Sequence, residues 1–452
     1  MKRGAVALLL LAAACTGSGT LGPFGSPAAS PAASRQPPVT HRPTATAPPG
    51  PTATPVPVPT GPGSAADALR RLCVRPPAPK ESPATPGPAP SAIQQVEQEV
   101  QQVRGFQYLR PVAVDAVTHD QLVQGLEAPF GHDFPAGLLS RRTRVWQLIG
   151  VIPADVGLRD AYRSFLSGQV IGYYDPGSGQ LVFLGTTDPS AAERLTLAHE
   201  LTHADDDQHF DLSRLNPLEN HCQDEALMAA TGAVEGSAQF FSFAVARRFF
   251  SPADLISLGL GGGGGSTAGV PPFVQTLALW PYLDGLNFIT AMDARGGLAA
   301  VNHALQDFPV STEQVMHPDR YPSDTPAPVD IPDLGPSLGP GWRDLDVMQV
   351  GEEWLKAMLA LRLAAADAAD AAAGWDGGLY RAWTDGPHVA VVLSTRWDSP
   401  ADADEFAAAA SRWLRPDQSA VVVHPSSPGS PVQMLVASDQ ATLAALRDSF
   451  PG

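Results

Sequence analysis

One segment near the middle of the chain predicts both a helix and the side chains that this helix presents. Ser190 and Glu193 have the spacing of a capping box, in which two side chains satisfy backbone donors at the start of a helix. Leu195, Ala198 and Leu201 follow at intervals of three residues, as on one face of a helix. The fold of this chain must therefore contain a helix that begins near Ser190 and has one face buried.

The polar residues of this helix form the pattern His-Glu-x-x-His. His199 and His203 lie four residues apart, so their imidazoles project from one face and can reach one metal ion about 2 Å away. Glu200 lies beside that face and can accept a proton from metal-bound water. The pattern predicts a zinc site, and a pair of surface histidines without a metal is the alternative.

A catalytic zinc ion needs a third protein ligand and an open position, and two residues compete for that role. Glu235 is the only charged residue between positions 226 and 246, where an unpaired carboxylate in an apolar helix would be costly. His209 has the metzincin spacing HExxHxxGxxH, with Asp206 at the glycine position, where Asp tolerates a left-handed backbone. We predict Glu235 as the ligand, because His209 lies beyond the last clear helical turn among aspartates and can be solvated there.

Three further side chains are candidates for stabilising an oxyanion, a role that metalloproteases give to His or Tyr. His317, directly before Pro318, is the first choice, and Tyr282 and Tyr321 are its rivals. Structural roles for all three fit the sequence equally well. The acidic run at residues 205–207 could orient a ligand imidazole through its second ring nitrogen, or it could be a solvated helix end.

Together these segments resemble a bacterial family of exported, gluzincin-like zinc metallopeptidases. The resemblance rests on residues 198–212 and on the Ala-Val-Glu-Gly-Ser-Ala block at 233–238. It is supported by the Gly-Tyr-Tyr-Asp-Pro block at 172–176 and by residues 311–321, and it extends loosely over residues 91–400.

The resemblance implies a zincin-like α+β core, zinc as the cofactor, a peptide or protein as the substrate, and hydrolysis by metal-activated water. Glu200 matches the position of the catalytic base. The zinc-ligand positions of the family match His199, His203 and Glu235. The sequence departs from the family at Ser237, where Asp is usual, and at Asp206. That departure leaves a second hypothesis open, namely a cell-surface binding protein with a structural or degenerate zinc site.

The first residues predict export. Lys2 and Arg3 precede a short apolar run at residues 5–14, which has the anatomy of a secretory signal and is too short to span a bilayer. Cys15 follows small residues in a pattern that resembles the lipobox of bacterial lipoproteins, although Ala12 stands where leucine is preferred. We therefore predict a lipoprotein signal peptide over residues 1–15 and a lipid anchor on Cys15. A plain signal peptide cleaved nearby is the alternative.

The composition of the remainder supports an exported protein on a stalk. Residues 16–90 are rich in Pro, Ala, Thr and Ser, and we expect a disordered stalk there, with a short helical patch at 65–72. Cys73 and Cys222 form an even pair that an oxidising compartment would join, with two separate buried thiols as the alternative. The net charge of −17, without a Lys/Arg cluster, argues against a nucleic-acid-binding surface.

The folded part is predicted to be α+β. We expect a peptidase domain over residues 91–344, including a hairpin of strands 170–174 and 180–184 around an Asp-Pro-Gly-Ser-Gly turn. A C-terminal α+β module should follow over residues 345–452. Its expected elements run in the order of a long helix at 347–373, strands at 380–383 and 389–393, a helix at 401–414, strands at 420–424 and 432–437, and a closing helix.

Overall fold

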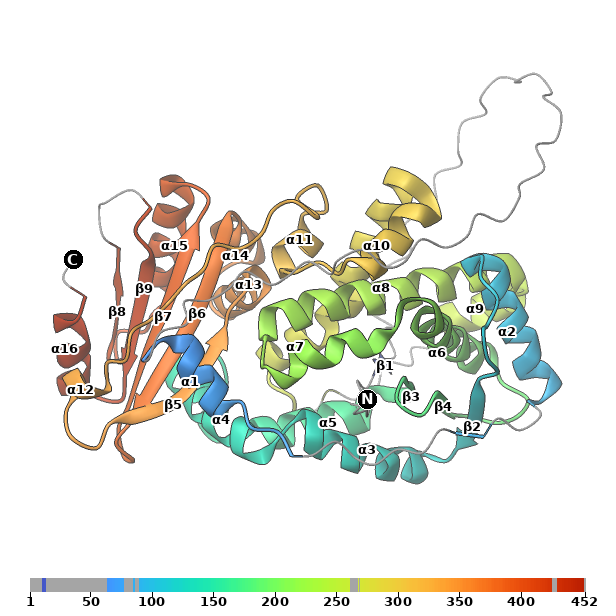
Figure 1. Cartoon of the computed structure of the whole chain (residues 1–452), viewed down its shortest axis with the longest axis horizontal. Helices are drawn as coiled ribbons and strands as arrows, with labels where there is room; N and C mark the ends of the chain where they lie inside the picture. Colours follow the sequence, from blue (N-terminus) through green and yellow to red (C-terminus); the bar gives the residue numbers. More distant parts are fainter. Residues whose placement is uncertain are drawn as a thin grey trace, which may run out of the picture.

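The computed structural model of the chain describes residues 10–13, 63–76, 84–85, 89–260, 267, 269–424 and 429–450. The predicted lipid attachment at Cys15 and residues 16–62 of the predicted stalk lie outside these described residues. Figure 1 shows a mostly helical body beside a C-terminal module built on a twisted sheet. The fold is therefore α+β, as the sequence predicts.

The body contains a small mixed sheet with the strand order β1-β3-β4-β2. The predicted hairpin is present, and it is formed by β3 (Val170–Asp175) and β4 (Gln180–Leu184). Its turn is stabilised by the carboxylate of Asp175, which accepts hydrogen bonds from the backbone amides of Gly177 and Ser178. On either side, β1 (Leu10–Ala13), which belongs to the predicted signal peptide, pairs antiparallel with β3, and β2 (Ala113–Val117) pairs parallel with β4.

Helices make up the rest of the body. Those before the hairpin are α2 (Ser91–Arg104), α3 (His119–Asp133), α4 (Ala136–Ile149) and α5 (Leu158–Gln169). Those after it are α6 (Ala191–Phe210), the 3-10 turn η1 (Leu212–Leu215), α7 (Asn216–Asn220), α8 (Asp224–Phe249), α9 (Pro252–Leu260), α10 (Pro272–Gln306), α11 (Thr312–Met316) and α12 (Gly335–Leu338). The predicted capping box of α6 is confirmed, because Ser190 accepts from the Glu193 amide and Glu193 accepts from the Ser190 amide.

The two longest helices, α8 and α10, approach each other backbone to backbone. Gly236 on α8 faces Gly285 on α10, and Gly285 in turn faces Gly232, so closely that a Cβ on Gly236 or Gly285 would collide with the facing main chain. Because Gly236 directly follows Glu235, this close approach fixes the depth at which Glu235 sits. α10 is interrupted at Gly296 and Gly297, where the backbone leaves helical geometry.

The C-terminal module differs from its prediction at its start. In place of a long helix over residues 347–373, the chain forms strand β5 (Arg343–Gln349) followed by two short helices, α13 (Glu352–Ala360) and α14 (Ala365–Ala372). Pairing of β5 with β6 overrides the helix propensity of this Ala-rich region. The remaining elements match their predicted types: β6 (Trp375–Thr384), β7 (Val389–Trp397), α15 (Pro400–Trp413), β8 (Ala420–Val423), β9 (Val432–Ala437) and α16 (Gln440–Asp448).

The sheet of this module is antiparallel, with the strand order β5-β6-β7-β9-β8, and both of its faces are covered. One face packs on α13, α14 and α15 in a core that continues into α4 and α5 of the body. The other face packs on α1 (Ala65–Leu72) and α16. The shared core joins the module to the body, and burial on both faces explains the unbroken apolar run of β7.

Residues 63–76 connect the two parts a second time. α1 lies against β5, and Cys73, at its end, is disulfide-bonded to Cys222 of the body, with a Cα–Cα distance of 6.0 Å. The predicted disulfide is therefore present, and such bonds are typical of extracellular compartments. None of the described helices combines the length and the apolar composition that a bilayer span requires.

Candidate metal centre

Three buried side chains from two helices converge on one point. His199 and His203 come from α6 and Glu235 comes from α8. Glu235 Oε2 lies 3.1 Å from His199 Nε2 and 3.4 Å from His203 Nε2, and the two Nε2 atoms are 3.1 Å apart. Two facing imidazole nitrogens can share at most one proton, so lone pairs converge here that a cation would satisfy. This group could hold a metal ion.

Burial prepares these groups for a cation. Burial is the largest influence on His199 and lowers its pKa, so the imidazole is neutral, which is the form that binds metals. Burial alone would raise the pKa of Glu235, but His203 and His199 outweigh it, so the pKa is lowered and the carboxylate is ionised. Glu200, the residue between the two histidines that we predict as a base, is fully buried beside them.

A buried polar network holds α6 and α8 in register. Asp206 on α6 accepts a hydrogen bond from Ser237 Oγ at 2.7 Å and, through its other oxygen, from Arg104 Nε at 2.7 Å. Arg104 also donates to Asn302 of α10. Because Ser237 lies two residues after Glu235, this network sets the position of Glu235 relative to the histidines. Ser237, which stands where the similar family usually has Asp, therefore donates a hydrogen bond to Asp206 in this chain.

Two further residues lie at this centre: Gln239, which the sequence did not indicate, and Tyr282, which was one of three oxyanion candidates. The side chain of Gln239, one turn after Glu235 on α8, lies near the imidazole of His199 and raises its pKa, against the larger lowering by burial. Tyr282 on α10 stacks on His199, with ring centroids 6.2 Å apart and an interplanar angle of 27°. The i, i+4 spacing of Glu235 and Gln239 could have indicated the first contact, whereas the second depends on how α10 packs.

His209 lies away from this centre. α6 continues through Phe210, so His209 is still helical, and the left-handed residue is Asp211 rather than Asp206. The imidazole of His209 stacks on Phe106, with centroids 4.2 Å apart, and its Nε2 is 3.0 Å from the carbonyl oxygen of Gln107. It therefore does not belong to the converging group, and of the two candidate third ligands only Glu235 does.

The other predicted site residues have partners elsewhere. His317 Nε2 lies 2.9 Å from Glu352 on α13, whose carboxylate is the largest cause of the raised pKa of His317. The hydroxyl of Tyr321 donates to the carbonyl of Asp307 at 2.5 Å. The acidic run pairs with arginines rather than with the ligand imidazoles, since Asp206 binds Arg104 and Asp207 binds Arg110.

A second acidic group, Glu313, Asp324 and Asp398, also has oxygens close enough for a shared cation. Here the cation is already part of the chain, because Arg320 Nη1 lies 2.7, 3.1 and 2.6 Å from the three carboxylates. This group is therefore an ion-pair cluster between the body and the module.

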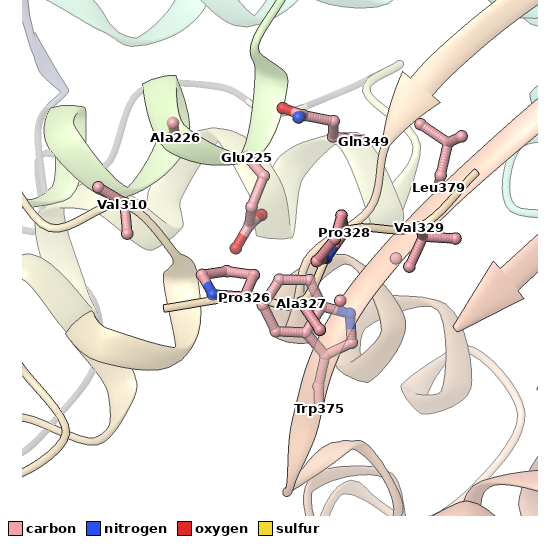
Figure 2. Close-up of a pocket in the computed structure, with 12 residues that line it drawn as sticks. Glu225, Ala226, Val310, Pro326, Ala327, Pro328, Val329, Gln349, Trp375 and Leu379 are labelled. Atoms are coloured by element: carbon pink, nitrogen blue, oxygen red, sulfur yellow. The ribbon is translucent and has the colours of Figure 1, made fainter. Parts of the chain in front are cut away.

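Two cavities lie near the junction of the body and the module. Figure 2 shows the smaller one, of about 60 Å³, between Glu225 of α8, Pro326 and Trp375 of β6. The larger one, of about 320 Å³, has Glu235 and Tyr282 in its wall. Of these two cavities, the larger one reaches Glu235 of the converging group, so a ligand in it could meet a metal bound there.

Comparison with known proteins gives a family match for the module and none for the candidate metal centre. Residues 343–446 match a family model described as Domain of unknown function (DUF8575), which corresponds to the five-stranded sheet and its helices. No curated protein and no solved structure matches the chain. The family match therefore covers neither α6 nor α8, and any function of the converging group has to be argued from its chemistry.

Proposed function

We propose that the chain is an exported, zinc-dependent peptidase whose metal is held by His199, His203 and Glu235. The observation that carries the proposal is the mutual spacing of their ligand atoms. Bonds of 2.0–2.1 Å in a tetrahedral zinc site place neighbouring ligand atoms about 3.3–3.4 Å apart. The three separations here, 3.1, 3.1 and 3.4 Å, are close to that value. A His₂Glu set leaves a fourth position for water or substrate, as in catalytic rather than structural zinc sites.

The roles of the remaining residues follow from their placement. When bound, zinc would lower the pKa of water and polarise a carbonyl group. Glu200, beside the two histidines, accepts the proton of the attacking water and later returns it to the leaving amine. We assign the donor to the oxyanion to Tyr282, because it stacks on His199 and lines the larger cavity. His317, the candidate favoured by sequence, would first have to leave Glu352.

Replacement of the base separates this proposal from a structural zinc site. Glu200→Gln should retain one metal ion per chain and lower the rate of peptide hydrolysis by about 10²–10⁴, the usual contribution of a general base. Cleavage of a peptide library by the purified chain, with and without a chelator, provides the assay. A Glu200→Gln variant that cleaves as fast as the wild type, or wild-type cleavage that persists after complete metal removal, would refute the mechanism.

The proposed location rests on the leader and the disulfide. We propose that residues 1–15 direct export and that Cys15 carries a lipid which holds the protein at the membrane. The Cys73–Cys222 disulfide supports an oxidising compartment. Metabolic labelling with a fatty acid tests the anchor: label should enter the wild type and be absent from a Cys15→Ser variant. Equal labelling of both would exclude Cys15 as the attachment site.

A further inference from the structure

The larger cavity has a chemical character that bears on what could be bound beside the candidate metal centre. Its volume, about 320 Å³, lies at the lower end of the range typical of ligand sites. Glu235 and Tyr282 form the end nearest the converging group. Much of the remaining wall is apolar, and helices α4, α5, α10 and α13 contribute to it through Leu139, Phe165, Leu277, Ala278 and Trp354.

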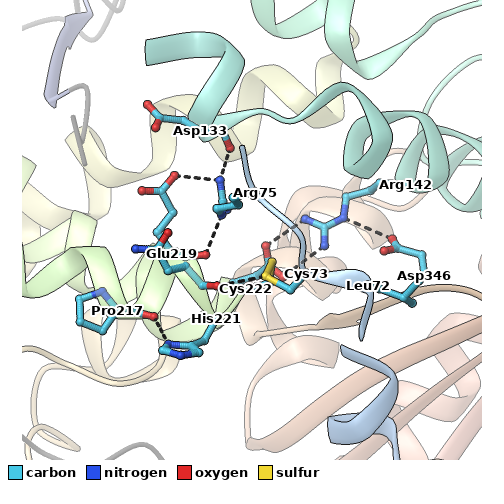
Figure 3. Close-up of a disulfide and its surroundings, with 12 residues drawn as sticks. Leu72, Cys73, Arg75, Asp133, Arg142, Pro217, Glu219, His221, Cys222 and Asp346 are labelled. Atoms are coloured by element: carbon cyan, nitrogen blue, oxygen red, sulfur yellow. Dashed lines mark hydrogen bonds and ion pairs between the residues drawn. A yellow bond between two sulfur atoms is a disulfide. The ribbon is translucent and has the colours of Figure 1, made fainter. Parts of the chain in front are cut away.

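The cavity wall contains two basic and six acidic residues, so its charged part is acidic in excess. Arg75 lies 3.1 Å from Glu219 and donates to the carbonyl of Asp133, and Figure 3 shows this arrangement next to the disulfide. Arg142 lies 2.9 Å from Asp224. These are the two basic residues of the lining, and both are paired with carboxylates. An acidic ligand would therefore meet no unpaired cation in this wall.

From this lining we infer that the cavity binds a bulky apolar side chain of a peptide substrate, of the size of leucine, methionine or phenylalanine, beside the bond to be cleaved. The inference rests on the proposed peptidase function and adds a substrate class to it. Burial of such a side chain is worth roughly 10- to 100-fold in affinity over an exposed one. An aspartate in the same place would lose its hydration without gaining a partner.

Ala278 offers a direct test, because it lines the cavity and its side chain is small. Ala278→Phe should fill part of the space and lower the preference for leucine or phenylalanine over alanine at least tenfold. Leu277→Ala, the second variant, removes side-chain volume from the same wall and enlarges the cavity. It should shift the substrate preference towards tryptophan. Ala294→Phe, an equal change at an exposed site on the same helix, should leave the profile of the wild type unchanged.

Two measurements on the full-length chain distinguish the possible failures. The first is the cleavage profile of a peptide library that varies one residue at a time. The second is the binding of labelled peptides to the Glu200→Gln variant, measured by fluorescence polarisation. The peptides differ at one position, which is Leu, Phe, Ala or Asp. If the chain hydrolyses peptides without an apolar preference, or if neither Ala278→Phe nor Leu277→Ala changes that preference, the proposed substrate pocket is refuted. The proposed peptidase function would stand in either case. The opposite result is also possible: the wild type hydrolyses no peptide, but binding favours apolar peptides and Ala278→Phe removes that selectivity. This result would support the apolar pocket and refute the peptidase function.

Discussion

Removal of the Glu235 carboxylate should deprive the candidate metal centre of one of its three converging ligands. Four-ligand structural zinc sites contribute about 10–16 kcal/mol, which corresponds to about 2.5–4 kcal/mol per ligand. Glu235→Ala should therefore weaken zinc binding by roughly 10²–10³. The loss should be at the upper end of this range, because Glu235 is the only anionic ligand and lies within 3.4 Å of both imidazoles.

His209→Ala is the matched control, since His209 is the competing ligand by sequence. Its imidazole stacks on Phe106 and bonds the Gln107 carbonyl, so its loss should cost about 1–2 kcal/mol of stability through packing and one hydrogen bond. It should leave the zinc stoichiometry near one, because His209 contacts none of the three converging residues.

Competition with a chromophoric chelator gives the zinc affinity of each variant, and elemental analysis after desalting gives the stoichiometry. Thermal unfolding with and without zinc shows whether a lost affinity reflects a lost ligand or a lost fold. The reasoning fails if Glu235→Ala retains zinc at wild-type affinity while folded His209→Ala loses it, since the ligand set would then be of the metzincin type.

Other parts of the molecule give further predictions. Gly236→Ala places a Cβ against the α10 backbone and should destabilise the chain by about 3 kcal/mol in urea unfolding, whereas Gly259→Ala, with open space around it, should be neutral or stabilising by up to about 1 kcal/mol. Burial raises the pKa of Glu225 from 4.5 to about 7, so the folded state holds an extra proton in this interval and stability should fall as the pH rises through it. Glu225→Gln should reduce that slope by an effect on the order of 3 kcal/mol, in melting curves taken from pH 4 to pH 8. The slope that remains belongs to Asp205, Glu219 and Glu353, because burial raises the pKa of each of them to about 7 as well. The disulfide joins residues 149 positions apart, so replacing both Cys73 and Cys222 with serine should cost about 5 kcal/mol in the chain-entropy estimate; an unchanged melting temperature would contradict it.

The features that the sequence predicts best are those that depend on residues close to one another in the chain. The capping box at Ser190 and the histidine pair of α6 depend on residues within one or two turns, and both are present in the structure. Glu235 is non-local, yet it was predictable because a lone carboxylate in an apolar helix requires a partner. The cost of desolvating the Glu235 carboxylate thus indicated its contact with His199, which lies 36 residues earlier in the chain.

The features that sequence misses depend on how distant elements pack. β5 was expected to be part of a helix because its neighbourhood is rich in alanine, but Val347 and Met348 are buried on opposite faces of a sheet, an arrangement that exists only once β6 is in place. Tyr282 could not be ranked above His317 or Tyr321, because its stacking on His199 depends on the approach of α10 to α8. That approach depends in turn on glycines in both helices.

The disulfide also determines how the chain would carry a mechanical load. A pull that enters at residue 63 reaches α1, which is fastened to the module by Arg71 and Asp344, and then Cys73. From Cys73 the tension passes through the sulfur–sulfur bond to Cys222 and bypasses residues 74–221. The helix that carries His199 and His203 belongs to this bypassed loop. A protein held at a surface by its N-terminus could thus be dragged by its tether without stretching that helix.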